Sequence, residues 1–234
     1  MKEKIFMIDL HHGDCISKMK SLTDKSVDLI VTDPPYLMDF QSGFRTATPQ
    51  FDKIAGDLDG HDLIKQYFFE CERILKDDTH IYSFCSWHHI NFFKEQFEKY
   101  FTLSNILVWN KPGGGMGDLE GSYQPSHEFV LFGHKGRRPL TGKRTPDTIR
   151  HSRVTASTMV HPTEKPVTLI EEFILVSSEK GDVVFDGFMG AGSHGMAAVR
   201  NERSFIGCEI HDTYFKIAEE RIETASCTLE NFFQ

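Results

Sequence analysis

The chain has 234 residues, 39% of them hydrophobic and 26% charged, with a net charge of −8; this supports one globular domain and excludes a disordered or fibrous protein. No apolar run is long enough to cross a membrane and the first residues are too charged for a signal peptide, so we expect a cytoplasmic protein. The five cysteines are far apart with no CxxC pair, which argues against a disulfide framework and a cysteine zinc site.

Segments typical of strands and helices alternate along the chain, and this pattern favours an α/β fold with a mainly parallel sheet. Residues 27–32 are apolar and β-branched, as in a buried parallel strand, and the run stops at the turn signal Asp33-Pro34-Pro35. Apolar residues at helical spacing predict a helix over 62–75. The elements expected next are a strand over 79–84, a helix over 88–100, and strands over 102–109 and 127–132.

Periodicity disappears between residues 135 and 160, which we interpret as an insertion. Within 135–153, seven basic residues stand against one acid, so this stretch carries +6 and the remainder of the chain −14. Such a local excess can contact a phosphate backbone, although a solvated charged loop is an equally good interpretation. The basic residues are Lys135, Arg137, Arg138, Lys143, Arg144, Arg150 and Arg153.

Regular elements are expected again after Pro166, which suits the first turn of a helix. The elements expected there are that helix, a strand over 182–186, a glycine-rich turn, a helix from residue 193, a strand over 204–209 and a final helix over 212–225.

The glycine-rich turn follows a predicted strand and opens a predicted helix, and it contains Gly190 and Gly192. Glycines in this position allow the backbone to approach a ligand closely. Glu209 ends the next strand about twenty residues later, where a carboxylate can bind the diol of a ribose. A plain tight turn and a helix-capping acid are the alternatives. Together the two features indicate an adenosine-containing ligand, with a nicotinamide cofactor still open.

Asp33-Pro34-Pro35-Tyr36 directly follows the buried strand. An exocyclic amine on a nucleobase is a poor nucleophile because its lone pair is delocalised into the ring. The Asp33 carboxylate and the Pro34 carbonyl could localise that pair by accepting hydrogen bonds from the amine. Tyr36 could stack on the base, worth roughly 1–3 kcal/mol, against a few kcal/mol to extrude it from a duplex. A rigid turn with a capping Asp is the alternative.

With the segments 10–15, 109–112, 126–128 and 161–166, these motifs resemble the DNA amino-methyltransferases in their β-class order, over almost the entire chain. The resemblance implies a Rossmann-like S-adenosylmethionine-dependent methyltransferase fold. It also implies a mainly parallel, seven-stranded-type sheet with helices on both faces. We expect one domain over 1–234, with a catalytic half over 1–134, a short target-recognition insertion over 135–160, and a cofactor-binding half over 161–234.

The resemblance also implies roles for single residues. Asp14 is similar to the acid near the cofactor adenine, Lys165 to the residue that holds the cofactor's carboxylate, and Glu209 to the ribose acid. Gly187 and the Ser193-His194 pair depart from the family pattern, and we expect both to change loop stiffness more than chemistry. The implied catalytic residues are Asp33, Pro34, Pro35 and Tyr36. The implied cofactor-binding residues are Asp14, Asp33, Lys165, Asp186, Phe188, Gly190, Gly192, Ser193 and Glu209.

We therefore expect methyl transfer from S-adenosylmethionine, without a metal, to the N6 amino group of adenine in double-stranded DNA, by base flipping and direct in-line transfer. Adenine is preferred because DPPY, rather than SPPY, is commoner among the adenine enzymes of the family; Phe40 and Phe44 could line the larger purine pocket or belong to the core. The basic residues of the insertion are the expected DNA contacts. An N4-cytosine methyltransferase, a non-catalytic DNA-binding homologue and a nicotinamide oxidoreductase are the alternatives.

The same resemblance makes a homodimer plausible and suggests a bacterial or phage-encoded protein of the restriction-modification type. The target sequence and any partner nuclease stay open.

Overall fold

The computed structural model describes residues 7–37, 60–113, 120–142, 145–155, 157–161 and 163–232, with side chains up to residue 227. The strands are β1 (Ile8–His12), β2 (Val27–Thr32), β3 (Leu75–Cys85), β4 (Thr102–Asn110), β5 (His127–Lys135), β6 (Thr148–Arg150), β7 (Val183–Asp186) and β8 (Ser204–Glu209). The helices are α1 (Cys15–Ser21), α2 (Gly60–Ile74), the 3₁₀ turn η1 (Trp87–His89), α3 (Ile90–Glu98), α4 (Val167–Ser177), α5 (Ser193–Arg200) and α6 (Asp212–Phe232).

The strands form one mixed sheet in the order β1-β8-β7-β2-β3-β5-β4-β6. Seven of the eight strands in the described residues point the same way, and β5 runs antiparallel to its neighbours β3 and β4. The expected α/β fold with a mainly parallel sheet is confirmed. The sheet has eight strands where a seven-stranded type was expected, because the short β6 pairs with β4 as the outermost strand.

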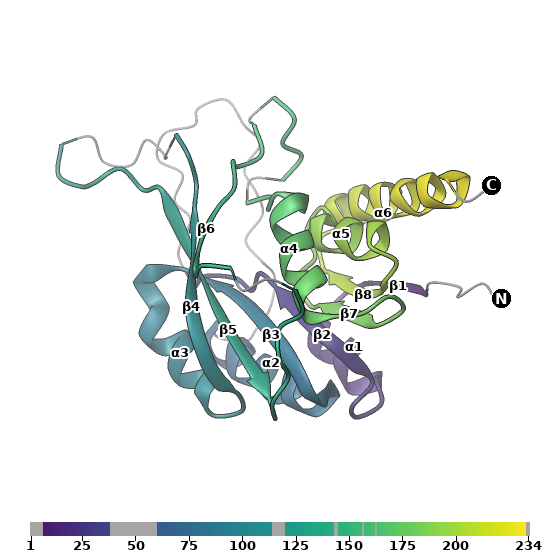
Figure 1. Cartoon of the computed structure of the whole chain (residues 1–234), viewed down its shortest axis with the longest axis horizontal. Coiled ribbons are helices and arrows are strands. Elements are labelled where there is room, and N and C mark those ends of the chain that lie inside the picture. The colour runs from purple at the N-terminus through teal and green to yellow at the C-terminus, as the bar shows by residue number, and fades with distance from the viewer. Residues whose placement is uncertain are drawn as a thin grey trace.

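Helices cover both faces of the sheet (Figure 1), as expected. Helices α1, α2 and α3 pack on one face, where Phe68 meets Ile30 of β2 in one core cluster. Helices α4, α5 and α6 pack on the other face, where Ile170 and Ile222 share a cluster with Leu29. Adjacent residues of β2 therefore enter opposite cores, which explains why the whole strand is apolar.

Three elements lie outside the sequence-based prediction. β1 and α1 are short, and every side chain of β1 is partly or fully exposed, so neither carries a strong hydrophobic period. β6 lies in the segment expected to lack regular structure, where Ile149 pairs with Trp109 of β4. Three residues are too few to show a strand period, so this pairing depends on the neighbouring strand.

Parallel strands bring their carboxyl ends to one edge of the sheet, where ligands bind in open α/β folds. Asp33 follows β2 there, Asp186 ends β7 and Glu209 ends β8. We call this edge the carboxyl edge and the opposite one the amino edge. No helix among the described residues is long and apolar enough to span a bilayer.

Candidate active site

The two carboxylate oxygens of Asp33 have different surroundings. Oδ2 accepts a hydrogen bond from Lys165 Nζ at 2.6 Å. Oδ1 is buried and has no hydrogen-bond partner among the described residues. A buried polar atom without a partner costs free energy, so its persistence points to a ligand that donates to it. The adjacent Pro34 and Pro35 have no N–H group that could compete for this oxygen.

Tyr36 is held by two charged side chains next to Asp33. Its hydroxyl donates to Glu128 Oε2 at 3.1 Å and accepts from Lys165 Nζ at 3.3 Å. The same ammonium lies 5.4 Å from the centroid of the Tyr36 ring and 5.0 Å from that of Phe84, within cation–π range. The Tyr36 ring is therefore fixed before any ligand arrives.

Lys165 also contacts a second carboxylate, which makes the cluster a chain of alternating charges. Its Nζ lies 3.2 Å from Glu128 Oε2, and Glu128 Oε1 accepts from Lys111 Nζ at 2.7 Å. The Lys165 side chain is only 4% exposed. We call Asp33, Lys165, Glu128 and Lys111 the charge chain. Two acids balance two bases, so the buried cluster is neutral when all four are ionised.

Burial and the oppositely charged neighbours shift the pKa values of the charge-chain residues in opposite directions. Burial raises the pKa of Asp33 above its usual value, although Lys165 opposes that rise. Burial would lower the pKa of Lys165, but Asp33 and Glu128 outweigh it and raise this pKa. Burial would raise the pKa of Glu128, but Lys165 and Lys111 outweigh it and lower this pKa. Lys165 and Glu128 therefore stay ionised near neutral pH, and Asp33 is the acid whose charge is easiest to lose.

Asp186 organises the glycine turn from inside the protein. Its Oδ1 accepts from Thr32 Oγ1 at 2.9 Å and from Phe188 N at 3.0 Å, and its Oδ2 pairs with His194 Nδ1. Both oxygens of this fully buried carboxylate are thus bonded to the protein itself. Asp186 shapes the turn, and the unusual His194 supplies one of the bonds that fix it.

The other departure from the family pattern, Gly187, also has a local partner. Its N–H donates to the Tyr67 hydroxyl at 3.3 Å, and a Cβ at this position would lie 2.4 Å from Tyr67 Cε2. Phe188 packs on the same ring, with centroids 4.8 Å apart. The ring of Tyr67 therefore occupies the space into which a larger residue at position 187 would project.

Glu209 and the glycine turn are bonded to each other at the carboxyl edge. Glu209 Oε2 accepts from Gly190 N at 2.9 Å and Oε1 from His211 N at 2.8 Å. Gly192 has φ +84°, and an added Cβ would lie 2.9 Å from the Ala218 backbone. The neighbouring Ser193 Oγ is buried without a partner among the described residues. A hydroxyl at this position beside a glycine turn suits a polar ligand.

Asp14 follows β1 and caps α1 at the same edge, where its Oδ2 accepts from Ser17 N at 2.8 Å.

Arg221 of α6 stabilises the glycine turn through hydrogen bonds. Its Nη1 donates to the Ala191 carbonyl at 2.6 Å, and its Nη2 to Glu164 Oε1 at 2.6 Å.

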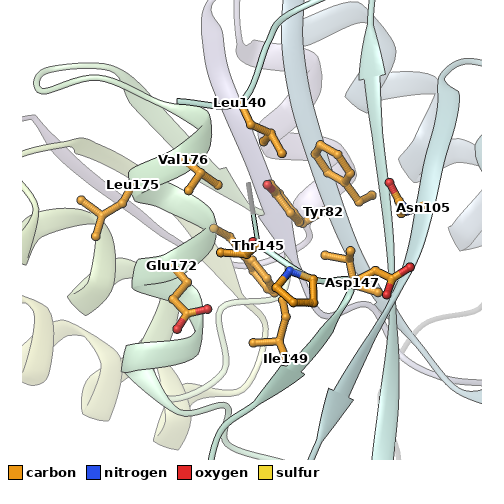
Figure 2. Close-up of a pocket in the computed structure, with 13 residues that line it drawn as sticks. Tyr82, Asn105, Leu140, Thr145, Asp147, Ile149, Glu172, Leu175 and Val176 are labelled. Atoms are coloured by element: carbon orange, nitrogen blue, oxygen red, sulfur yellow. The ribbon is translucent and has the colours of Figure 1, made fainter. Parts of the chain in front are cut away.

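A separate cavity of about 540 Å³ lies between α4 and the side of the sheet that contains β4 and β5. Figure 2 shows Tyr82, Asn105 and Ile149 around it, with Glu172 from α4. Neither Asp33 nor any residue of the glycine turn lines it, so it is distinct from the site at the carboxyl edge.

A family model described as DNA methylase, of the N6/N4 type, matches residues 27–220 of the chain. The chain belongs to this family of N6/N4 DNA methylases. The resemblance stated from the sequence motifs is thereby confirmed. The match includes Asp33 and Glu209, so one family pattern spans both the strand turn and the cofactor-like turn.

Similar proteins cover nearly all of this methylase. DNA adenine methyltransferase YhdJ of Escherichia coli K12 is 28% identical over 92% of the chain and 82% of its own length. Type II methyltransferase M.HinfI of Haemophilus influenzae is 28% identical over 95% of the chain and 70% of its own length. Among solved structures, the M1.HpyAVI–SAM complex is 25% identical with a TM-score of 0.67, covering 92% of this chain and 100% of that one. The cytosine-N4-specific PvuII methyltransferase, 18% identical with a TM-score of 0.72 over 98% and 95% of the two chains, shares the fold.

The structure brings most of the expected site residues of the methylase together, while their roles stay predictions. Asp33, Tyr36 and Lys165 are in contact, and the glycine turn lies on the next strand towards β8. Lys165, expected at the cofactor's carboxylate, donates to Asp33, and its role towards the cofactor stays a prediction. Phe188, expected at the cofactor, has its ring on Tyr67.

The basic residues of the insertion are divided between the two edges. Lys135 ends β5 at the amino edge, where its Nζ lies 3.0 Å from Glu72 Oε1. Arg137 and Arg138 follow at that edge, and the latter lies 3.9 Å from Asp182. This placement does not favour these three as contacts of a ligand at Asp33. Arg150 ends β6 at the carboxyl edge, Arg153 is exposed beyond it, and Lys143 and Arg144 lie outside the described residues.

The functional-site residues that the sequence did not predict are Glu128 and Lys111. Both lie within the family motifs, but no role was expected for either. Each stands where β5 begins or β4 ends, so both reach the carboxyl edge. Their charge at a strand end was the available signal. Trp87, 59% exposed, and the fully exposed Tyr123 also lie in segments at this edge and were not singled out. Phe40 and Phe44, the suggested purine-pocket residues, lie outside the described residues.

Proposed function

We propose that this methylase transfers a methyl group from S-adenosylmethionine to the N6 amino group of adenine in double-stranded DNA. The observation that carries the proposal is the buried Oδ1 of Asp33, which has no hydrogen-bond partner in the described part of the chain; the glycine turn follows the adjacent strand β7, and Glu209 ends β8 beyond it. Family membership supplies the reaction class, and the SAM complex of M1.HpyAVI, 25% identical over 92% of the chain, supports the cofactor.

The residues at the carboxyl edge fit this cofactor. The Ser193 Oγ, which has no partner within the described ranges, and the turn at Gly190, with φ +50°, offer a polar cradle, and Asp14 follows the end of β1. Each Glu209 oxygen already accepts one backbone N–H, and its second lone pair can accept from a ribose hydroxyl. When bound, S-adenosylmethionine supplies an electrophilic methyl group on a sulfonium.

The protein's own groups then prepare the target amine. Asp33 Oδ1 and the Pro34 carbonyl accept hydrogen bonds from its two N–H groups, which localises the nitrogen lone pair for attack on the methyl carbon. Tyr36, held by Glu128 and Lys165, offers its ring to the flipped base. Positioning and preorganised acceptors account for the rate, and no covalent bond to the enzyme forms.

Adenine is the preferred target over cytosine. The DPPY form of the motif is commoner among the adenine enzymes of the family, and the relative YhdJ is named a DNA adenine methyltransferase. The cytosine-N4-specific PvuII enzyme is only 18% identical and supports the fold alone. N4-cytosine methylation is the second candidate because the family includes both chemistries.

The purified protein, unmethylated duplex DNA and methyl-labelled S-adenosylmethionine test the proposal. Digestion of the product to nucleosides and mass spectrometry should detect N6-methyladenine, with no signal when S-adenosylhomocysteine is in excess. N4-methylcytosine in its place would replace the adenine assignment. Absence of any methylated nucleoside, across genomic DNA of mixed sequence, would leave only a DNA-binding homologue.

A further inference from the structure

The charge chain holds Asp33 by one oxygen only. Lys165 Nζ donates to Oδ2 at 2.6 Å, while Oδ1 is buried and no residue that the structure describes donates to it. Moving Lys165 away from Asp33 would cost free energy, because its ammonium also contacts Glu128 and lies over two aromatic rings. The Lys165 side chain is only 4% exposed. An ammonium this deeply buried needs close carboxylate partners, since desolvation alone would favour its neutral form.

We propose that Lys165 and Glu128 are positioning residues for Asp33: Lys165 fixes one carboxylate oxygen, Glu128 offsets the charge of Lys165, and the second oxygen remains aimed at the target amine. This inference rests on the proposed function, and it gives Lys165 a task different from gripping the cofactor's carboxylate. Glu128 is needed because a lone ammonium at 2.6 Å would draw electron density from Asp33 and weaken it as an acceptor. Lys111, at 2.7 Å, keeps Glu128 ionised from the outer side.

The two positioning residues have opposite effects on the ionisation of Asp33. Lys165 lowers the pKa of Asp33 and Glu128 raises it, on top of the larger rise due to burial. Replacing Lys165 by Met should therefore raise this pKa, and replacing Glu128 by Gln should lower it. A double replacement removes both influences and should bring the value back towards that of the parent protein. A structural role alone does not predict that the acid limb of kcat follows these shifts while the affinity for S-adenosylhomocysteine stays unchanged.

Three other titratable groups lie around Asp33 and Lys165. Burial raises the pKa of Tyr36 well above its usual value and that of Cys85 to about 12. His161, which faces Lys165, has its pKa lowered to about 4, first by burial and then by Lys165. These three groups are neutral near pH 7, and Tyr36 and Cys85 keep their protons throughout the acid range. The NMR signal of the Asp33 carboxyl carbon separates its titration from that of His161.

The experiment compares the parent protein with Lys165→Met, Glu128→Gln and the double variant. The pH dependence of kcat should have its acid limb at higher pH in Lys165→Met and at lower pH in Glu128→Gln, with the double variant between them. The affinity for S-adenosylhomocysteine should stay within about threefold in all of them. Glu70→Gln, which removes a partly buried carboxylate bonded to Arg73 away from the site, should leave the limb unmoved.

A second readout keeps the test valid where activity is lost. The carboxyl carbon of Asp33, labelled with ¹³C and assigned by its disappearance in Asp33→Ala, reports this pKa directly by NMR, without DNA. Shifts in the same direction in both variants, or none, would overturn the inference. So would a large loss of S-adenosylhomocysteine affinity in Lys165→Met with an unmoved pKa, which would return Lys165 to the cofactor. If the parent protein methylates no DNA but the NMR shifts are opposite, the proposed function fails and the electrostatic arrangement stands.

Discussion

One carboxylate oxygen of Asp33 is bonded to Lys165 and the other has no partner among the residues described, and this asymmetry suits a hydrogen-bond acceptor for an amine. A free carboxylate at the end of a strand could rotate, whereas a 2.6 Å bond to a buried ammonium fixes its plane. The Pro34-Pro35 step adds stiffness on the backbone side. Local sequence and a distant lysine therefore act on the same side chain.

Replacing Asp33 by Ala should lower kcat by about 10²–10³-fold or more, the usual cost of losing one preorganised group that acts on the transition state. S-adenosylhomocysteine binding should change little, because Ser193, the glycine turn and Glu209 remain. Methyl transfer and calorimetry measure the two effects. Asp62→Ala, an exposed acid of α2 bonded to Lys65, is the matched control and should retain activity. Full activity in Asp33→Ala would remove its assigned role.

Trp87 is a second residue whose exposure invites a test. Its ring is 59% exposed and stacks on His88 with centroids 3.7 Å apart, just beyond the end of β3 at the carboxyl edge. If it stacks on a base, Trp87→Ala should weaken duplex binding by about 1–3 kcal/mol. Phe69, equally apolar and 53% exposed, packs on Tyr100 near the amino edge and provides the control. Equal losses in both variants would contradict a base-stacking role.

At the scale of elements, the glycine turn is the segment in which shape and function depend most on each other. It joins β7 to α5, is anchored by Asp186 and Arg221, and passes Gly192 close to the α6 backbone. At the two positions that depart from the family pattern, Gly187 donates to the Tyr67 hydroxyl and His194 pairs with Asp186, and both contacts support the turn.

Gly192→Ala should destabilise the protein by more than the about 1–3 kcal/mol that a positive φ costs a non-glycine residue, because its Cβ would also lie 2.9 Å from the Ala218 backbone. Gly142→Ala has a similar φ of +78° but meets nothing within 4 Å, so it measures the backbone strain alone. Urea unfolding of both variants checks the difference. Equal losses of unfolding free energy would show that the contact with α6 is unimportant.

In the molecule as a whole, the topology of the sheet divides the basic residues of the insertion between the amino edge and the carboxyl edge. The reversal of β5 places Lys135 at the amino edge, and the return of the chain along β6 brings Arg150 back to the carboxyl edge. The net charge of −8 leaves the rest of the surface unfavourable for DNA. Binding should therefore depend on a few cations at one edge.

Arg150→Ala and Arg153→Ala should each weaken DNA binding across sequences and reduce the salt dependence of log K by about 1 per lost phosphate contact. Lys135→Ala should leave that slope unchanged because its ammonium is paired with Glu72 at the other edge. Fluorescence anisotropy at several salt concentrations measures the slopes. A reduced slope in Lys135→Ala alone would place the DNA on the amino edge.

Ligand binding should stabilise the folded domain as a unit. At a hundredfold excess over its Kd, S-adenosylhomocysteine should add about 2.7 kcal/mol and raise Tm by about 5–10 °C. Glu209→Gln should reduce the shift, because a neutral amide accepts hydroxyl hydrogen bonds less strongly than a carboxylate. Calorimetry at matched ligand concentrations compares them. NAD in place of S-adenosylhomocysteine should give no shift, and a shift with NAD alone would favour the nicotinamide alternative.

Local runs of residues were enough to predict the central strand and its turn at Asp33, the glycine turn, Glu209 and the family, because the chemistry of each run depends on its neighbours in the chain. The three-dimensional fold was needed to find the contacts of Lys165, 132 residues from Asp33, and the pairing of Glu128 with Lys111. It also decided which cations face the site. Strand order and the direction of β5 set those contacts, and neither is encoded in a local period or motif.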